Sequence, residues 1–142
     1  MTKQKAPTTS KALALFCTKI LQDKLAEDIV VLELTDIESS PAEFFVICSS
    51  NSDPQSLAIV DELLQKTKQV GLTRPRVEGL NNAEWILLDY FDVVVHVMLK
   101  PIRSFYKIEK LWADAKFYKF NAETEKLNKL KPTDTVKILN SI

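Results

Sequence analysis

The sequence has few of the residues on which most catalytic and metal sites depend: in 142 residues it contains one His, two Cys and two Gly. A single His cannot form a two-histidine metal site, and Cys17 and Cys48 cannot build a zinc cluster by themselves. Gly71 and Gly79 are too far apart for a Gly-rich phosphate loop. These shortages argue against an enzyme, and they predict neither a metal site nor a cofactor.

Long hydrophobic runs are also missing. The longest apolar stretches, around Phe44–Cys48 and Val93–Leu99, are far shorter than the roughly 18 to 20 residues that a membrane helix needs. The run Ala12–Cys17 is too short for a signal sequence and is followed by Lys19, and the N-terminus lacks the Arg-rich composition of a transit peptide. The sequence therefore predicts a cytoplasmic protein, bacterial rather than organellar, with no membrane contact and with reduced core thiols.

The chain has enough hydrophobic residues to form the core of one domain. Its charge is unevenly distributed along the sequence. Hydrophobic residues make up 46% of the chain, and 19 basic side chains balance 19 acidic ones. Residues 1–22 carry a net charge of +4 and residues 116–142 carry +3, so residues 23–115 carry −7. An acidic body is repelled by nucleic-acid phosphate and suits a basic protein partner, although an ordinary solvated acidic surface has the same composition.

Periodicity and capping signals predict a single compact α/β domain over residues 10–120. Helices are expected over 10–26, from a cap at Ser52 to a stop at Gly71, and from Lys100 with Ile102, Phe105, Ile108 and Trp112 along one side. Strands are expected over 29–35, 43–48, 75–78 (at an edge of the sheet), 84–89 and 92–99. Residues 1–9 are interpreted as a flexible basic N-terminus and residues 121–142 as a Lys-rich C-terminal extension.

The last two strands predict a hairpin whose two faces differ. With Tyr90 and Phe91 as a two-residue loop, Asp89 lies opposite Asp92 and Trp85 opposite His96. One face is then entirely aliphatic, as expected under packed helices, and consists of Ile86, Leu88, Val93, Val95, Val97 and Leu99. The other face is apolar in its middle and charged at one end, and consists of Trp85, Leu87, Asp89, Asp92, Val94, His96 and Met98.

This mixed face has the composition of an interface, because Trp85 beside Leu87 and Asp89 combines an aromatic anchor with a charge. The facing carboxylates of Asp89 and Asp92 leave three interpretations open: solvated turn residues, a site for a Lys or Arg of a partner, or a metal site. His96 is interpreted as a structural or interfacial histidine, because nothing in the sequence supplies the other members of a catalytic triad.

An ordered set of segments resembles the Iojap-like ribosomal silencing factors (RsfS), over roughly residues 12–115. The segments are Phe44–Ile47, Ser49–Ser52, Val77–Gly79, Glu84–Tyr90, Asp92–Val97, Arg103–Tyr106 and Leu111–Trp112. The sequence departs from the family pattern at Phe91, where the family commonly has Gly after the aromatic residue of the hairpin turn.

The resemblance implies a mixed sheet similar to the nucleotidyltransferase fold, a homodimer in the free state, and no enzymatic activity. It implies binding to large-subunit ribosomal protein fourteen, which blocks joining of the ribosomal subunits and represses translation under nutrient limitation. By position in the motifs, the implied contact residues are Trp85, Leu87, Asp89, Tyr106 and Arg103. The basic ends of the chain could add minor contacts to ribosomal RNA.

Two alternatives remain open at this point. One is a divergent nucleotidyltransferase-like enzyme that holds magnesium on Asp89 and Asp92, although no third carboxylate or backbone phosphate cradle is visible in the sequence. The other is a plain dimerisation module, whose mixed face serves only self-association.

Overall fold

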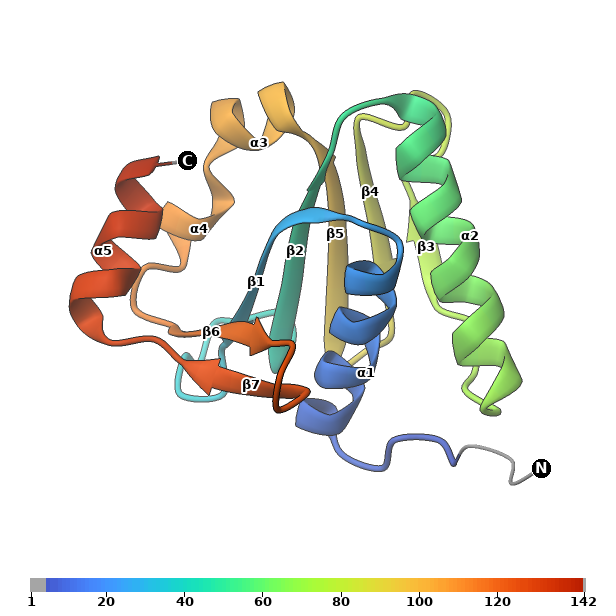
Figure 1. The fold of residues 1–142 in the computed structure, drawn as a ribbon, viewed down its shortest axis with the longest axis horizontal. Coiled ribbons are helices and arrows are strands. Elements are labelled where there is room, and N and C mark those ends of the chain that lie inside the picture. The colour runs from blue at the N-terminus through green and yellow to red at the C-terminus, as the bar shows by residue number, and fades with distance from the viewer. Residues whose placement is uncertain (1–4, 142) are drawn as a thin grey trace.

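The structure, a computed structural model, describes residues 5–141; the first four residues of the predicted basic N-terminus lie outside the described residues. Seven strands form one mixed sheet in the order β3-β4-β5-β2-β1-β6-β7 (Figure 1). The strands are β1 (Glu27–Glu33), β2 (Phe44–Ser50), β3 (Arg76–Glu78), β4 (Trp85–Asp89), β5 (Val93–Leu99), β6 (Lys116–Asn121) and β7 (Lys126–Lys129). The helices are α1 (Ser10–Asp23), α2 (Asp53–Gln69), α3 (Lys100–Tyr106), α4 (Ile108–Leu111) and α5 (Pro132–Ser141).

This arrangement confirms the predicted single α/β domain with a mixed sheet. Only β2 and β5 pair in parallel, and every other neighbouring pair of strands is antiparallel. The parallel pair follows from the α2 crossover, because parallel neighbours need a long connection. The short strand β3 lies at an edge of the sheet, as the flanking proline predicted.

The first two helices form where their capping residues predict. The Thr9 hydroxyl accepts a hydrogen bond from the backbone N–H of Ala12 at the start of α1, and the Ser52 hydroxyl accepts one from Gln55 at the start of α2. Helix α2 ends as predicted before Gly71, which has a φ of +89°. Helix α1 ends three residues before the predicted limit, because Leu25 takes a left-handed φ of 59°.

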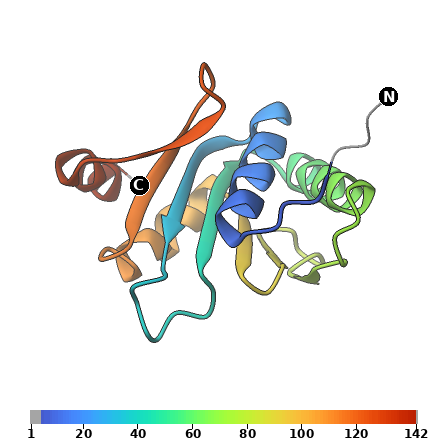
Figure 2. The ribbon, with the colours of Figure 1, turned by 90° about the horizontal axis from the view of Figure 1, so that it is seen from below.

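The sheet carries a hydrophobic core on each face. Helices α1 and α2 cover one face, and α3, α4 and α5 lie over part of the other (Figures 1 and 2). The first core confirms the predicted aliphatic face: Ile86, Leu88, Val93, Val95 and Val97 are all fully buried in it. Leu99, at the end of β5, is only partly buried.

The predicted third helix is two helices. Lys107 adopts a left-handed φ of 49° and ends α3 after seven residues, and α4 then starts along a new direction. The break separates residues that one continuous helix would place on a single side. Ile108 is buried in the second core, whereas Phe105, expected on the same side, is 77% exposed.

The chain beyond residue 120 continues the same sheet. The expected end of the domain falls inside β6, which pairs with β1, and β7 then extends the sheet by one more strand. Ile138 and Leu139 of α5 pack against the second core. The weak periodicity of this Lys-rich segment reflects a hairpin and a short helix that are each half exposed.

The predicted register of the β4–β5 hairpin was wrong by two residues. Trp85 pairs with Met98, Leu87 with His96, and Asp89 with Val94. The loop consists of Phe91 and Asp92, because the Tyr90 N–H donates to the Val93 carbonyl oxygen. A shift of two residues leaves each side chain on its predicted face, since side chains alternate with a period of two, but it removes the expected opposition of Asp89 and Asp92.

Candidate partner-binding surface

Strand β4 presents Trp85, Leu87 and Asp89 on one face, as predicted. All three are partly buried, and the residues between them, Ile86 and Leu88, are fully buried in the opposite core. Trp85 and Leu87 pack against the edge of the second core. The strand therefore exposes part of an indole, part of an isobutyl group and a carboxylate in one row, a combination that is typical of binding hot spots.

Trp85 is held in one orientation by two neighbours. Its indole N–H donates a hydrogen bond to Nδ1 of His96 on β5, with a nitrogen–nitrogen distance of 3.1 Å. The ring of Tyr106, at the end of α3, lies 5.1 Å from the indole centroid to centroid. A fixed aromatic side chain loses little conformational entropy when it binds, so this arrangement prepares Trp85 to act as an anchor.

His96 is a buried, structural histidine whose pKa is strongly lowered. It is 6% exposed, and burial, with the positive charge of Arg103 as a second cause, lowers its pKa from 6.5 to about 3. The imidazole is therefore neutral at physiological pH and carries its proton on Nε2, because Nδ1 accepts the hydrogen bond from Trp85. Nε2 has no hydrogen-bond partner among residues 5–141.

Six rings form a continuous row across this face of the sheet. In order they are Trp112, Phe45, His96, Trp85, Tyr106 and Phe105, with successive centroids 5.8, 4.6, 6.0, 5.1 and 5.0 Å apart. The Trp112 end is partly covered, whereas Tyr106 and Phe105 are 52% and 77% exposed. Trp85 and Tyr106 were predicted from the sequence as contact residues, whereas the contribution of Phe45 and Phe105 was not, because the rings come from four separate elements and the connection after α4.

Arg103 lies inside the protein rather than on the surface. Its Nε donates to Oε1 of Glu109 at 2.6 Å, and its Nη1 donates to the Asp28 carbonyl oxygen and to the Ser49 hydroxyl at 2.7 and 2.9 Å. Both members of the ion pair are almost fully buried. The guanidinium thus fastens α3 to α4, β1 and β2, and it fixes the helix that carries Tyr106.

Asp89 is partly engaged by its own chain. Its Oδ1 accepts a hydrogen bond from the backbone N–H of Phe91 at 2.8 Å, and its Oδ2 lies 3.8 Å from Nη2 of Arg76 on β3. The ion pair is long, and the Arg76 side chain is 76% exposed. Pairs of this kind contribute little to stability, so a cation from another molecule can replace Arg76 at small cost.

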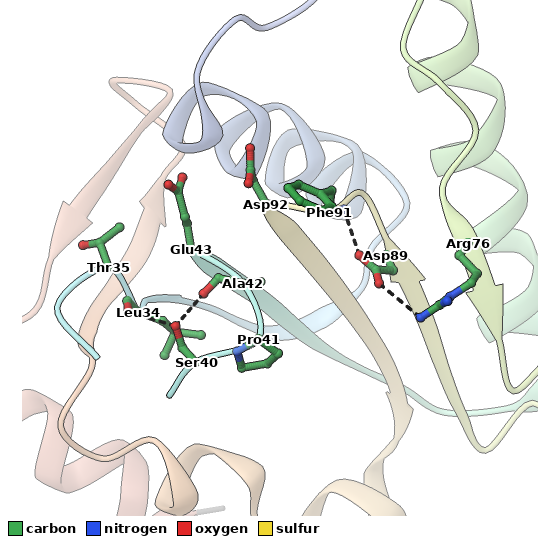
Figure 3. A pocket seen from close by; sticks show the side chains of 10 residues that line it. All are labelled: Leu34, Thr35, Ser40, Pro41, Ala42, Glu43, Arg76, Asp89, Phe91 and Asp92. Carbon is green, nitrogen blue, oxygen red and sulfur yellow. Dashed lines mark hydrogen bonds and ion pairs between the residues drawn. The ribbon is translucent and has the colours of Figure 1, made fainter. Parts of the chain in front are cut away.

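A cleft of about 690 Å³ opens beside Asp89, at the end of the sheet where β4 turns into β5 (Figure 3). Its walls are the hairpin loop, Arg76 of β3, and the chain from the end of β1 to the start of β2. The lining residues are Leu34, Thr35, Ser40, Pro41, Ala42, Glu43, Arg76, Asp89, Phe91 and Asp92. Three carboxylates against one guanidinium give the lining an acidic character.

The magnesium interpretation finds no ligand set. Within residues 5–141, no group of three or more His, Cys, Asp or Glu side chains is placed to hold a metal ion. In the corrected register Asp89 pairs with Val94, so Asp89 and Asp92 are not the cross-strand pair on which that interpretation depended. No helix among these residues is long and apolar enough to cross a bilayer.

Residues 7–139 match the family model described as ribosomal silencing factor during starvation (RsfS). The chain belongs to this family. Its members are ribosome-associated, non-enzymatic factors of translation regulation, and this sets aside the enzymatic alternative. The match also runs through the β6–β7 hairpin and most of α5, beyond the resemblance seen in the sequence.

Relatives with this family name occur in several bacteria. The chain is 42% identical to ribosomal silencing factor RsfS of Bacillus subtilis, over 74% of this chain and 88% of that protein. It is 41% identical to RsfS of Halalkalibacterium halodurans, over 75% of this chain and 91% of that protein. It is also 33% identical to the chloroplastic Iojap protein of Arabidopsis thaliana, over 75% of this chain but only 44% of that longer protein.

Two solved structures share the fold. The crystal structure of protein CV0518 from Chromobacterium violaceum superimposes with a TM-score of 0.70 at 30% identity, and it covers 74% of this chain and 87% of its own. A crystal structure from Bacillus halodurans superimposes with a TM-score of 0.63 at 39% identity, over 73% and 95% of the two chains.

Proposed function

We propose that this ribosomal silencing factor binds ribosomal protein fourteen of the large subunit and blocks docking of the small subunit by its volume. Translation is thereby repressed under nutrient limitation. The observation that carries the proposal is the row of Trp85, Leu87 and Asp89 on β4, extended by Tyr106, on an otherwise well-packed domain. A steric block needs neither turnover nor a cofactor, so its strength depends on affinity and concentration.

Trp85 supplies the anchor of this surface. Its indole is partly exposed and is already held by His96 and Tyr106, so binding can bury it without reordering the surrounding side chains. Preorganised aromatic residues dominate the energetics of many interfaces. Leu87 lies beside Trp85 on the same strand and extends the apolar contact.

Asp89 supplies the charge. The sequence from residue 23 to 115 carries a net charge of −7, which complements a basic ribosomal protein better than ribosomal RNA. Asp89 lies at the end of the apolar row, and its only cationic contact within the described chain is the long, exposed pair with Arg76. A Lys or Arg of the partner would compete for this carboxylate.

Tyr106 and Arg103 have different roles in the proposal. The Tyr106 ring is half exposed and packs on Trp85, so it can contact the partner directly. Arg103 is buried and positions α3 through Glu109, Asp28 and Ser49. We therefore assign Arg103 a positioning role in place of a direct contact.

The experiment is co-sedimentation of the full chain with isolated large subunits. The wild type should pellet in one-to-one ratio, whereas Asp89→Lys, checked for folding by circular dichroism, should stay in the supernatant because it places a cation against a basic partner. A matched control is Glu123→Lys, the same charge reversal at an exposed position in the β6–β7 turn, which should pellet like the wild type. A wild type that never pellets would refute the proposal.

The free protein is further proposed to be a cytoplasmic homodimer with a nucleotidyltransferase-like sheet. The adjacent rings of Phe105 and Tyr106 are exposed, as is Leu111 on α4 at 76%, and this is apolar surface that a second copy could cover. If the protein were only a dimerisation module, Trp85→Ala would give monomers without any change in ribosome binding. Analytical ultracentrifugation beside co-sedimentation separates these outcomes.

A further inference from the structure

The hairpin loop holds a bulky aromatic residue in a backbone conformation that favours glycine. Phe91 has a φ of +79°, and the Asp92 N–H donates to the Tyr90 carbonyl oxygen across it, which is the hydrogen bond of a tight γ-turn. Its side chain is 84% exposed, so packing within the described chain does not compensate for the strain. Glycine would be less strained here. An exposed Phe at such a position points to a contact of its side chain with another molecule.

Phe91 lies on the rim of the cleft at the end of the sheet, beside the proposed interface. Asp89 belongs to both surfaces: it is the last residue of the Trp85–Leu87–Asp89 row and it lines the cleft (Figure 3). The cleft is therefore continuous with the face that we assign to the ribosomal partner. Pro41, which is exposed, contributes apolar surface to its lining, and the buried Leu34 lies beneath it.

The charge of the cleft indicates the chemistry of its occupant. Glu43 and Asp92 precede the adjacent parallel strands β2 and β5, and the Glu43 N–H donates to the Asp92 carbonyl oxygen, so both residues lie at the same end of the sheet (Figure 3). With Asp89 they give three negative charges against the single positive charge of Arg76. This balance repels RNA phosphate and favours Lys or Arg.

We propose that this cleft receives a basic, extended segment of the same ribosomal protein, with Phe91 packed against it. The inference rests on the proposed function and adds a second contact region to it. Arg76 then acts as an internal substitute for a cation of the partner. It forms the ion pair with Asp89 in the free protein, and the partner's cation replaces it in the complex. Phe91 is a specificity determinant of this chain. Its ring stabilises the complex, whereas its left-handed backbone conformation lowers the stability of the free protein.

The test is a pair of glycine variants measured for both stability and binding. Phe91→Gly should raise the urea midpoint of unfolding and weaken binding to purified large subunits by about fivefold. Leu25→Gly is the matched control, since Leu25 is also exposed, at 78%, has a φ of 59°, and lies away from the cleft, after α1. It should raise the midpoint without changing the affinity. Unchanged affinity of Phe91→Gly would overturn the inference.

Arg76→Gln provides an independent test, because it should change the affinity in the opposite direction from Phe91→Gly. Removing the internal cation should tighten binding by about two- to threefold, and the gain should shrink at high salt. Weaker binding would show that Arg76 itself contacts the partner or supports β3, and would contradict its role as a substitute.

The occupant is identified by photocrosslinking on purified large subunits, with benzoylphenylalanine introduced at position 91 or at position 87. Crosslinks from both positions to one ribosomal protein, with a Lys- or Arg-bearing peptide at position 91, support the inference. A crosslink at 87 alone, or a crosslink from 91 to RNA, overturns it while leaving the proposed function intact. Failure of the wild type to bind refutes the proposed function itself.

Discussion

The face of the sheet under α1 and α2 is lined mainly by aliphatic side chains, with Phe44 and Tyr118 among them, whereas the opposite face carries a row of rings, a neutral histidine and a buried ion pair. The first face is covered by two well-capped helices and leaves β4 no exposed apolar surface. The second is covered by a broken helix and a C-terminal helix, and it leaves Trp85 and Leu87 partly exposed. We therefore assign stability to the first face, and under the proposed function we assign both stability and binding to the second.

The largest loss of stability is expected when one member of the buried Arg103–Glu109 ion pair is removed from the second face. Arg103→Ala leaves Glu109 buried without a counter-ion and should lower the free energy of unfolding by about 3 to 5 kcal/mol, measured by urea denaturation. The double variant Arg103→Met, Glu109→Leu should recover much of this loss, because it leaves no uncompensated buried charge. Equal losses for the single and double variants would show that packing, and not the ion pair, holds α3.

A somewhat smaller effect is expected on binding, and a pair of neighbouring variants on β4 distinguishes the loss of binding from the loss of stability. Trp85→Ala should weaken binding to large subunits by at least about 30-fold, roughly 2 kcal/mol, because it removes a central aromatic anchor. Ile86→Ala, the next residue on β4 and part of the first core, should cost about 2 to 5 kcal/mol of stability but leave the affinity of the folded protein unchanged. If Ile86→Ala weakened binding as much as Trp85→Ala, the division between the faces would fail.

A pH-dependent effect of about 2 kcal/mol is expected from His96. Its pKa is about 3 in the folded protein, below the usual 6.5, so the unfolded chain takes up the proton first as the pH falls. The free energy of unfolding should therefore be highest above about pH 6.5 and decrease by about 2 kcal/mol between pH 7.5 and pH 5. His96 is the only histidine in the chain, so His96→Gln should remove this decrease. Parallel pH profiles of the two proteins would contradict the assignment.

The smallest change in stability is expected at the loop of the β4–β5 hairpin. Phe91→Gly relieves the left-handed strain but adds flexibility to the unfolded chain, so the net gain in stability should be about 0.5 to 1 kcal/mol. Equilibrium unfolding in urea checks the value. A loss of stability would mean that the exposed ring makes a compensating contact within the chain.

The sequence predicted the first face nearly completely, because strict alternation in β4 and β5 and strong caps at Thr9 and Ser52 are local signals. It also placed Trp85, Leu87 and Asp89 together, since side-chain alternation survives a register error of two residues. The register itself was missed because Phe91 accepts a φ that usually belongs to glycine.

The rest of the second face depends on contacts between distant segments. The break at Lys107 leaves no signal in the hydrophobic pattern, and it determines that Phe105 is exposed and Arg103 is buried. The continuation of the sheet through β6 and β7 was hidden by the many lysines of that segment, because an exposed edge hairpin shows little alternation.

The most direct test is a subunit-joining measurement with purified small and large ribosomal subunits, resolved on sucrose gradients. Added wild-type protein should shift joined ribosomes to separate subunits in proportion to its occupancy of the large subunit, whereas folded Trp85→Ala at the same concentration should not. If the wild type occupied the large subunit and joining proceeded normally, or if Trp85→Ala blocked joining equally well, the β4 face would not be the silencing surface.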